Sequence, residues 1–249
     1  MIKILNYTTN PLTTIGVVAS ECYNTKLKDE SHARRIAEHC IRSGHGRNLE
    51  FADITMTISG YSARMVRELY THIVGTSRTQ SSTRYIIYDE FEYITPSNLK
   101  GEALEIYQNT MNSIKEGYKK LKDLGIENDI TGYILPLGMT STFNLKINAR
   151  ALEHMANLRM CNRALLEFRQ FMKELKQELS KLDEEWKWIS DNLLVPKCTK
   201  YGYCDEDYGC GLKPKKKDIE IITQKELRVL KQRISDLEFY KTNNEVRFL

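Results

Sequence analysis

A run of hydrogen-bonding side chains lies in the first third of the chain. Almost every position carries a hydroxyl, an amide or a guanidinium group: Thr76, Ser77, Arg78, Thr79, Gln80, Ser81, Ser82, Thr83 and Arg84. Hydroxyls and main-chain N–H groups can surround phosphate oxygens, and a planar guanidinium can bind them through two parallel hydrogen bonds. The run is therefore interpreted as a loop that binds an anionic ligand. A polar turn at the surface is the alternative.

A second polar set lies at the start of an otherwise apolar helical stretch, residues 146–164. Its members are Asn148, which can cap the helix, Arg150, His154 and Arg159. Two arginines and a histidine are costly to bury unless an anion meets them. Salt bridges within or between helices are the alternative, with Glu153 and Glu167 as the expected partners.

The elements that hold these side chains follow from the periodicity of the apolar residues. The predicted strands are residues 1–7, 50–59, 85–88 and 140–147. Gly60 is expected to begin a helix that continues through Ile73 and breaks at Gly75. This order places the polar run at the edge of a sheet, where ligands often bind.

Apolar residues spaced by three and four predict the long helices. These are residues 28–43, residues 102–124 closed by Gly125, and a helix from Asn148 that continues through residues 167–182. With 249 residues, 41% of them hydrophobic, the chain is long enough to bury a substantial core.

Charge and cysteine content exclude several classes of protein. A net charge of +4 gives little support for nucleic-acid binding, which needs a concentrated basic face. No apolar run approaches the length of a membrane span, and the amino terminus lacks the pattern of a secretory signal. Six cysteines without such a signal favour reduced thiols. We therefore expect a cytoplasmic protein.

The carboxyl-terminal part carries three cysteines at equal intervals, Cys198, Cys204 and Cys210. Their spacing does not match common zinc sites and no fourth ligand is obvious, so no metal is predicted. Lys215–Lys217 is interpreted as a solvated linker. Thr223 and Glu226 form a capping box for a helix whose apolar stripe is Leu227, Leu230, Ile234 and Leu237.

Three segments resemble the flavin-dependent thymidylate synthases. In that family's signature an Arg-His-Arg is followed by seven residues, a Ser and typically Gly-Arg-Tyr. Here His72, Ser82 and Arg84-Tyr85 match, with one residue more before Ser82 than the signature has. Thr71 and Ile73 stand at the flanking arginines, or His72 and Val74 if the alignment slips by one. Asn148 to Ala164 is similar to the family's second motif. Residues 44–51 resemble a third, with His45 and Glu50 matching. Gly132 stands where the family has another arginine.

The resemblance implies an α+β fold, with a mixed or antiparallel sheet and long helices, over residues 1–212. Residues 213–249 would then be a basic linker and an additional amphipathic helix. It also implies a homotetramer with sites between subunits, and reductive methylation of dUMP to dTMP. The cofactor would be FAD, with NADPH and methylenetetrahydrofolate as co-substrates. Small molecules would be the partners, rather than nucleic acid or a membrane.

Roles for individual residues are carried over only at matching positions. Arg159 is implied to be catalytic, contacting the uracil ring and stabilising the negative charge that develops when hydride arrives. The implied FAD contacts are His45, His72, Ile73, Arg78, Gln80, Asn148, Arg150 and His154. The implied nucleotide contacts are Leu69, Gln80, Ser81, Ser82, Thr83, Arg84 and Arg159.

Two other functions stay open on the sequence alone. One is a related flavoenzyme that methylates another uridine nucleotide. The other is a non-catalytic descendant that keeps the fold and acts as a binding or scaffold protein.

Overall fold

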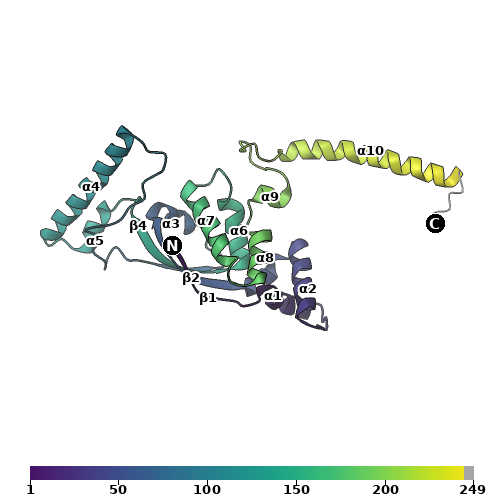
Figure 1. The fold of residues 1–249 in the computed structure, drawn as a ribbon, viewed down its shortest axis with the longest axis horizontal. Coiled ribbons are helices and arrows are strands. Elements are labelled where there is room, and N and C mark those ends of the chain that lie inside the picture. Colours follow the sequence, from purple (N-terminus) through teal and green to yellow (C-terminus); the bar gives the residue numbers. More distant parts are fainter. Residues whose placement is uncertain (244–249) are drawn as a thin grey trace. The chain divides into compact units, whose positions relative to one another are not determined.

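The computed structural model describes residues 1–243, except for the side chains of residues 220–223, 233–234 and 236–243 (Figure 1). The chain forms two compact units, Met1–Val195 and Pro196–Leu249. The family resemblance implies a different boundary, between residues 212 and 213. That boundary stays a prediction.

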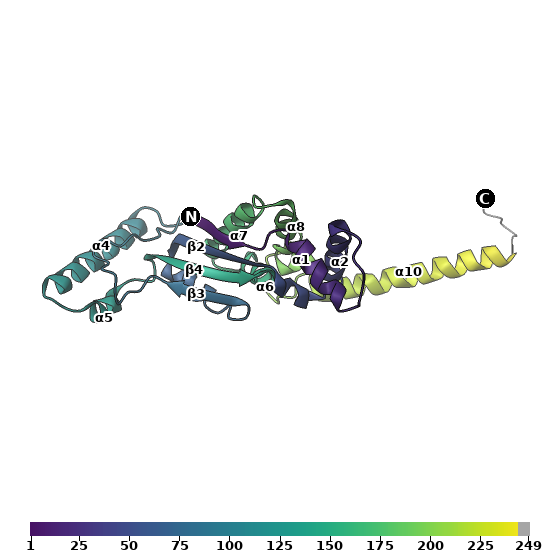
Figure 2. The same cartoon turned by 90° about the horizontal axis from the view of Figure 1, so that it is seen from below.

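The first unit is built on an antiparallel four-stranded sheet with the order β1-β2-β4-β3 (Figure 2). The strands are β1 (Ile2–Tyr7), β2 (Asp53–Ser62), β3 (Thr76–Gln80) and β4 (Thr140–Asn148). Alternate residues of β2 and β4 point into the core, among them Ile54, Met56, Phe143 and Leu145. The predicted strands 1–7, 50–59 and 140–147 are confirmed, with β2 beginning three residues later than expected.

Helices cover one face of this sheet and both of its ends (Figures 1 and 2). The α-helices are α1 (Pro11–Glu21), α2 (Glu30–Arg42), α3 (Ala63–Leu69), α4 (Glu102–Asp123), α5 (Asn128–Thr131), α6 (Ala149–Arg159), α7 (Leu166–Leu179) and α8 (Glu184–Leu193). Two 3₁₀ helices, η1 (Gly46–Phe51) and η2 (Gly132–Ile134), complete the unit. The predicted α+β class with long helices is confirmed.

The main core lies between the sheet and helices α6, α7 and α8. Phe168, Phe171 and Trp186 are its largest contributions from the helices, and all three are fully buried. The opposite face of the sheet is polar, since Asn144 hydrogen-bonds to both Thr57 and Thr79 across the strands. A sheet with one apolar and one hydrated face explains why the alternation in the sequence was clear.

Helix starts follow the capping rule that the sequence suggested for α6. Asn148 accepts a hydrogen bond from the main-chain N–H of Ala151, as predicted, and Ser62 caps α3 through Met65 in the same way. Helix α4 ends as predicted, and Gly125, just after its last turn, has φ +79°.

Three predictions about the polar run and its surroundings were wrong. Residues 76–80 form the edge strand β3 rather than a loop, because their main-chain groups pair with β4 while their side chains stay largely exposed. Residues 85–88 form turns and coil instead of a strand. Gly60 lies in β2 beside a shift in register, and the helix begins three residues later, after the Ser62 cap.

The helix after Asn148 is also shorter than predicted. It ends at Arg159, and residues 160–165 separate α6 from α7. This break turns Arg159 into the last residue of a helix rather than a residue in the middle of one. The polypeptide can therefore bring α7, with Phe168, alongside the end of α6.

The second unit contains α9 (Lys197–Tyr201) and α10 (Lys216–Asn243). Cys198, Cys204 and Cys210 are not joined in disulfide bonds, and no cluster that could hold a metal occurs among the described residues. Helix α10 begins seven residues before the predicted capping box at Thr223, which was therefore wrong. Leu227 and Leu230 are exposed, while the side chains of Ile234 and Leu237 lie outside the described part of the chain. No helix in the described residues is long and apolar enough to span a membrane.

Candidate active site

A tight turn between α3 and β3 forms the centre of the candidate site. Helix α3 ends at Leu69, and the chain reverses through residues 70–75 to enter β3. Gly75 has φ +74°, and a Cβ atom there would lie 2.7 Å from the side-chain nitrogen of Asn148. Glycine is therefore required for conformation and for space, which fixes the turn against the start of α6.

Arg78 holds this turn from the neighbouring strand. Its Nη1 donates hydrogen bonds to the carbonyl oxygens of Tyr70 and His72, each at 2.9 Å. Its guanidinium also lies over the Tyr70 ring, 4.8 Å from the ring centroid. A cation at these carbonyls satisfies acceptors that the end of α3 leaves without helical partners.

The guanidinium of Arg159 is fixed by four residues, Glu68, Thr71, His72 and Phe168, which we call the Arg159 cradle. Arg159 Nε donates to His72 Nε2 at 3.0 Å, Nη1 to the Glu68 carboxylate at 2.8 Å, and Nη2 to Thr71 Oγ1 at 3.1 Å. The ring of Phe168 lies beneath the guanidinium carbon at 5.0 Å. Only 20% of the Arg159 side chain is exposed. Its plane and direction are therefore set before any ligand binds.

His72 serves as a neutral acceptor in this arrangement. Burial, and then the positive charges of Arg159, His154 and Arg78, lower the pKa of His72 to about 4. Because Nε2 accepts a hydrogen bond, the ring proton of the neutral form is on Nδ1. Nε2 of His72 is therefore already used to accept the hydrogen bond from Arg159.

A surface pocket of about 360 Å³ opens beside the cradle. It is lined by Arg64, Arg67, Glu68, Thr71 and Leu137. Two of these residues belong to the cradle, so the pocket and the Arg159 guanidinium share a wall.

The predicted cofactor residues on α6 lie along one side of that helix. Arg150 forms an ion pair with Glu50 at 2.5 Å and lies close to Gly46, which places it beside His45. The ring of His154 lies 6.0 Å from that of His72, between centroids. The structure therefore brings four of the predicted cofactor residues to one region: His45, His72, Arg150 and His154.

The polar residues after β3 lie at the other end of that strand. Gln80 Nε2 donates to Ser141, and Ser81 Oγ donates to the carbonyl of Thr142. Thr83 packs against Gly132, and it does not have positive φ, so it is not strained. Arg84 makes two hydrogen bonds to Asp129, at 2.8 and 3.2 Å, and 65% of its side chain is exposed.

The two arginines that the sequence assigned to one nucleotide do not meet within one chain. Thr76 and Gln80, at the two ends of β3, are roughly 14 Å apart at 3.4 Å per residue. Arg84 bonds to Asp129 beyond the Gln80 end of β3, whereas Arg159 bonds to Glu68 of α3 and to Thr71 and His72 of the turn before β3. In the described residues the two arginines share no contact partner.

Ion pairs do hold both arginines, but with carboxylates that the sequence analysis did not name. Arg150 pairs with Glu50 and Arg159 with Glu68, whereas Glu167 accepts hydrogen bonds from Ser62. The sequence analysis missed Glu68, Phe168 and Asp129. Glu68 is 91 positions away from Arg159, and only the packing of α3 against α6 brings the two together.

Comparisons with known proteins agree on one family. The family model described as "Thymidylate synthase complementing protein" matches residues 3–183. The flavin-dependent thymidylate synthase of Pyrococcus furiosus is 31% identical over 234 residues, covering 87% of this chain and 95% of that protein. The protein of the same name from Pyrococcus abyssi is 30% identical over 220 residues, covering 82% and 89%.

A solved structure shares the fold. The flavin-dependent thymidylate synthase of Helicobacter pylori, in complex with FAD and dUMP, superposes with a TM-score of 0.62 at 22% identity. The match covers 78% of this chain and 99% of that one.

Proposed function

The chain belongs to the flavin-dependent thymidylate synthase family, and from this premise we propose how its residues carry out the reaction. The reaction is the reductive methylation of dUMP at C5, which gives dTMP. The observation that carries the proposal is the Arg159 cradle, which lies within the matched residues and holds one guanidinium in a fixed direction.

Arg159 polarises the pyrimidine. As a hydride reaches the ring, negative charge develops on it, and a fixed guanidinium stabilises that charge without having to reorganise. The cradle keeps the Arg159 side chain from bonding to other acceptors. His72 fixes the direction of Nε, and the Phe168 ring fixes the plane of the guanidinium. Such a donor is worth a few kcal/mol of transition-state stabilisation in typical cases.

Ser81, Ser82, Thr83 and Arg84 bind the phosphate of dUMP. Hydroxyls and an exposed guanidinium are the groups that this task needs. Because Arg84 lies away from Arg159 in one chain, we infer that the chain forms a homotetramer. In it, the Ser81–Arg84 segment of one subunit completes the site around Arg159 of another.

The region around η1 and the start of α6 fits an anionic dinucleotide. Arg150 is 54% exposed and bonded to a single carboxylate, and His45 and His154 are exposed beside it. These side chains would hold FAD, while Asn148 fixes the helix that carries them. When bound, reduced FAD supplies the hydride, methylenetetrahydrofolate the one-carbon unit and NADPH the reducing equivalents.

The remaining expectations follow from the same assignment. Substrates and cofactors are small molecules, and we propose neither a nucleic-acid partner nor a membrane partner. A biosynthetic flavoenzyme with free thiols fits the cytoplasm.

Two measurements test the function. The purified protein should show the absorbance spectrum of bound flavin. It should also release tritium from C5-labelled dUMP in the presence of NADPH and methylenetetrahydrofolate. Release from labelled UMP instead would identify the related methyltransferase with another uridine nucleotide. Absence of both flavin and tritium release would identify a non-catalytic descendant and refute the assignment.

A further inference from the structure

We propose that Arg64 and Arg67 form a phosphate-binding site in the pocket beside the Arg159 cradle. The site would supply positive charge that the family signature has at residue 71 and this chain lacks. The existence of an anion site rests on the pocket alone. The identity of its natural ligand rests on the proposed function.

The geometry places three polar side chains on one wall, of which Arg64 and Arg67 can bind a ligand. Arg64 and Arg67 are one turn apart on α3, and Thr71 follows one turn later, so the three side chains project to the same side. Leu137 closes the pocket, and it is tied to the helix because its carbonyl accepts a hydrogen bond from Arg64 N at 2.9 Å. A volume of about 360 Å³ is within the range of small-ligand pockets.

The charges in this pocket are not balanced by the protein. Both guanidinium groups are exposed, and in the described residues neither makes a hydrogen bond or an ion pair through its side chain. The one carboxylate in the wall, that of Glu68, is bonded to Arg159 at 2.8 Å. Two like charges three residues apart on a helix repel each other, and a bound anion would relieve that repulsion.

The other residues considered near the turn do not supply the missing positive charge. Ile73, at the second signature position, is 69% exposed and carries no charge. Arg78, one of the implied FAD contacts, uses Nη1 on the carbonyls of Tyr70 and His72. Arg64 and Arg67 face the pocket that Thr71 lines, and they are therefore better placed to compensate.

A phosphate group is the ligand chemistry that suits this site. The two guanidinium groups can donate several charge-assisted hydrogen bonds to phosphate oxygens, whereas the Thr71 hydroxyl already donates its proton to the carbonyl oxygen of Glu68. In the proposed reaction that phosphate has three sources: the diphosphate of FAD, the monophosphate of dUMP and the 2′-phosphate of NADPH.

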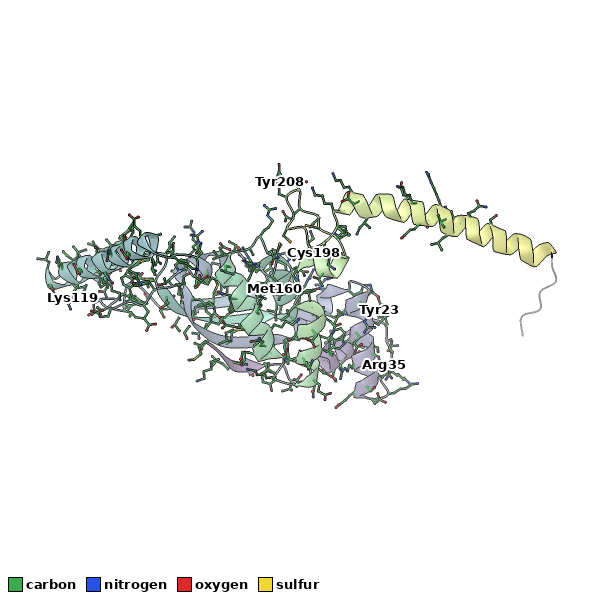
Figure 3. The ribbon with its side chains drawn as sticks, turned by 45° about the horizontal axis from the view of Figure 1, so that its top comes forward. Tyr23, Arg35, Lys119, Met160, Cys198 and Tyr208 are labelled. Carbon is green, nitrogen blue, oxygen red and sulfur yellow. The ribbon has the colours of Figure 1, made fainter. Side chains whose placement is uncertain are left out.

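The first test uses inorganic pyrophosphate as a probe and needs no activity. The double variant Arg64→Gln/Arg67→Gln removes both charges from exposed positions, so the fold should be kept, as its melting temperature without ligand will show. Arg35→Gln is the matched control, because Arg35 is an exposed arginine of α2 (Figure 3) whose one side-chain partner among the described residues is Ser31. Pyrophosphate should raise the melting temperature of the wild type and of the control equally, and that of the double variant clearly less, because only the phosphate sites proposed elsewhere in the chain remain.

The second test identifies the source of the phosphate. The dissociation constant of FAD, the KM of dUMP and the preference for NADPH over NADH are compared in the same three proteins. We expect one of them to weaken by about tenfold per arginine removed, and high salt should reduce this difference.

The outcomes separate this proposal from the proposed function. If pyrophosphate stabilises the double variant as much as the wild type, the site does not exist. If the pyrophosphate effect depends on the two arginines but all three ligand constants are unchanged, the assignment of the site to FAD, dUMP or NADPH is wrong. If the pyrophosphate effect depends on the two arginines but the wild type holds no flavin and releases no tritium, the anion site stands and the assigned reaction fails.

Discussion

Two arginine-bearing regions of the first unit are prepared for binding to very different degrees. Arg159 is four-fifths buried and is bonded to Glu68 of α3 and to Thr71 and His72 of the turn that follows, with an aromatic ring from α7 beneath it. Arg84 is two-thirds exposed and has one ion-pair partner, Asp129. The Arg159 guanidinium is held inside the structure, and the Arg84 guanidinium lies at its surface.

The difference follows from what each group must do. A group that stabilises charge in a transition state has to be oriented in advance, because reorganisation would add to the barrier. A group that captures a phosphate needs reach and charge more than a fixed direction. Comparison of the two regions therefore separates chemistry at Arg159 from substrate capture at Arg84.

The largest expected effect is that of Arg159→Ala. Turnover should fall by about 10²–10³-fold or more, because the charge that develops on the pyrimidine loses its fixed donor. FAD should stay bound, since the predicted flavin contacts at His45, Arg150 and His154 are untouched. Initial rates of tritium release, together with the flavin absorbance of the variant, measure the two effects separately.

A matched variant distinguishes orientation from charge. Arg159→Lys keeps the positive charge but cannot bond to His72, Glu68 and Thr71 at the same time. It should be nearly as slow as Arg159→Ala. Rates close to the wild type in either variant would remove Arg159 from the catalytic step.

Arg84→Gln should have a smaller effect and one of a different kind. With one charge-assisted contact to phosphate lost, the KM for dUMP should rise by about tenfold while kcat changes little. Steady-state kinetics with varied dUMP make this measurement. A fall in kcat as large as that of Arg159→Ala would show that Arg84 acts in the chemical step, and the contrast between the two regions would be lost.

The sequence predicted the parts of the fold that have a strong period. Strands β2 and β4 alternate because one face of the sheet is buried, and α4 repeats its apolar residues every three or four positions. Strand β3 has no such signal. All five of its residues are polar and none is buried, so only its main-chain pairing with β4 makes it a strand. The apolar residues Ile86 and Ile87 led to the wrong prediction of a strand at residues 85–88. Both are exposed and lie outside any strand.

The candidate site was also predictable only in part. The resemblance singled out His72 and Arg159 separately, and the structure joins the two side chains by a hydrogen bond within one chain. It gave no indication that Glu68 completes the arrangement, because partners were sought close by in the sequence. Contacts over 91 positions depend on how α3 and α6 pack, and no local pattern encodes that packing.

The pH dependence of stability tests how tightly the cradle holds His72. Its pKa of about 4 in the folded protein is below the ordinary value of 6.5. Between these two values the unfolded chain binds the proton more readily, so folding is favoured above pH 6.5 and this contribution is lost as the pH falls towards 4. After allowance for solvent screening, the loss from pH 7 to pH 5 should be roughly 1–2 kcal/mol.

The variant His72→Gln isolates this contribution. It keeps an acceptor for Arg159 but does not titrate, so its free energy of unfolding should fall less between pH 7 and pH 5 than that of the wild type. Urea denaturation of both proteins at the two pH values supplies the comparison. Equal losses would mean that His72 is not held neutral, and that Arg159 is less firmly oriented than its contacts indicate.

The smallest expected effect is that of Asp129→Asn. The hydrogen bond from Arg84 holds the pKa of Asp129 below its usual value, so the ion pair is intact at neutral pH and is lost only in acid. Because both side chains are exposed, the melting temperature should not change measurably. In the wild type, however, Asp129 competes with the phosphate for Arg84. Its removal should lower the KM for dUMP by roughly two- to threefold at low salt and have no effect at high salt. A higher KM instead would mean that Asp129 orients Arg84, and that the surface arginine is prepared for its ligand much as Arg159 is.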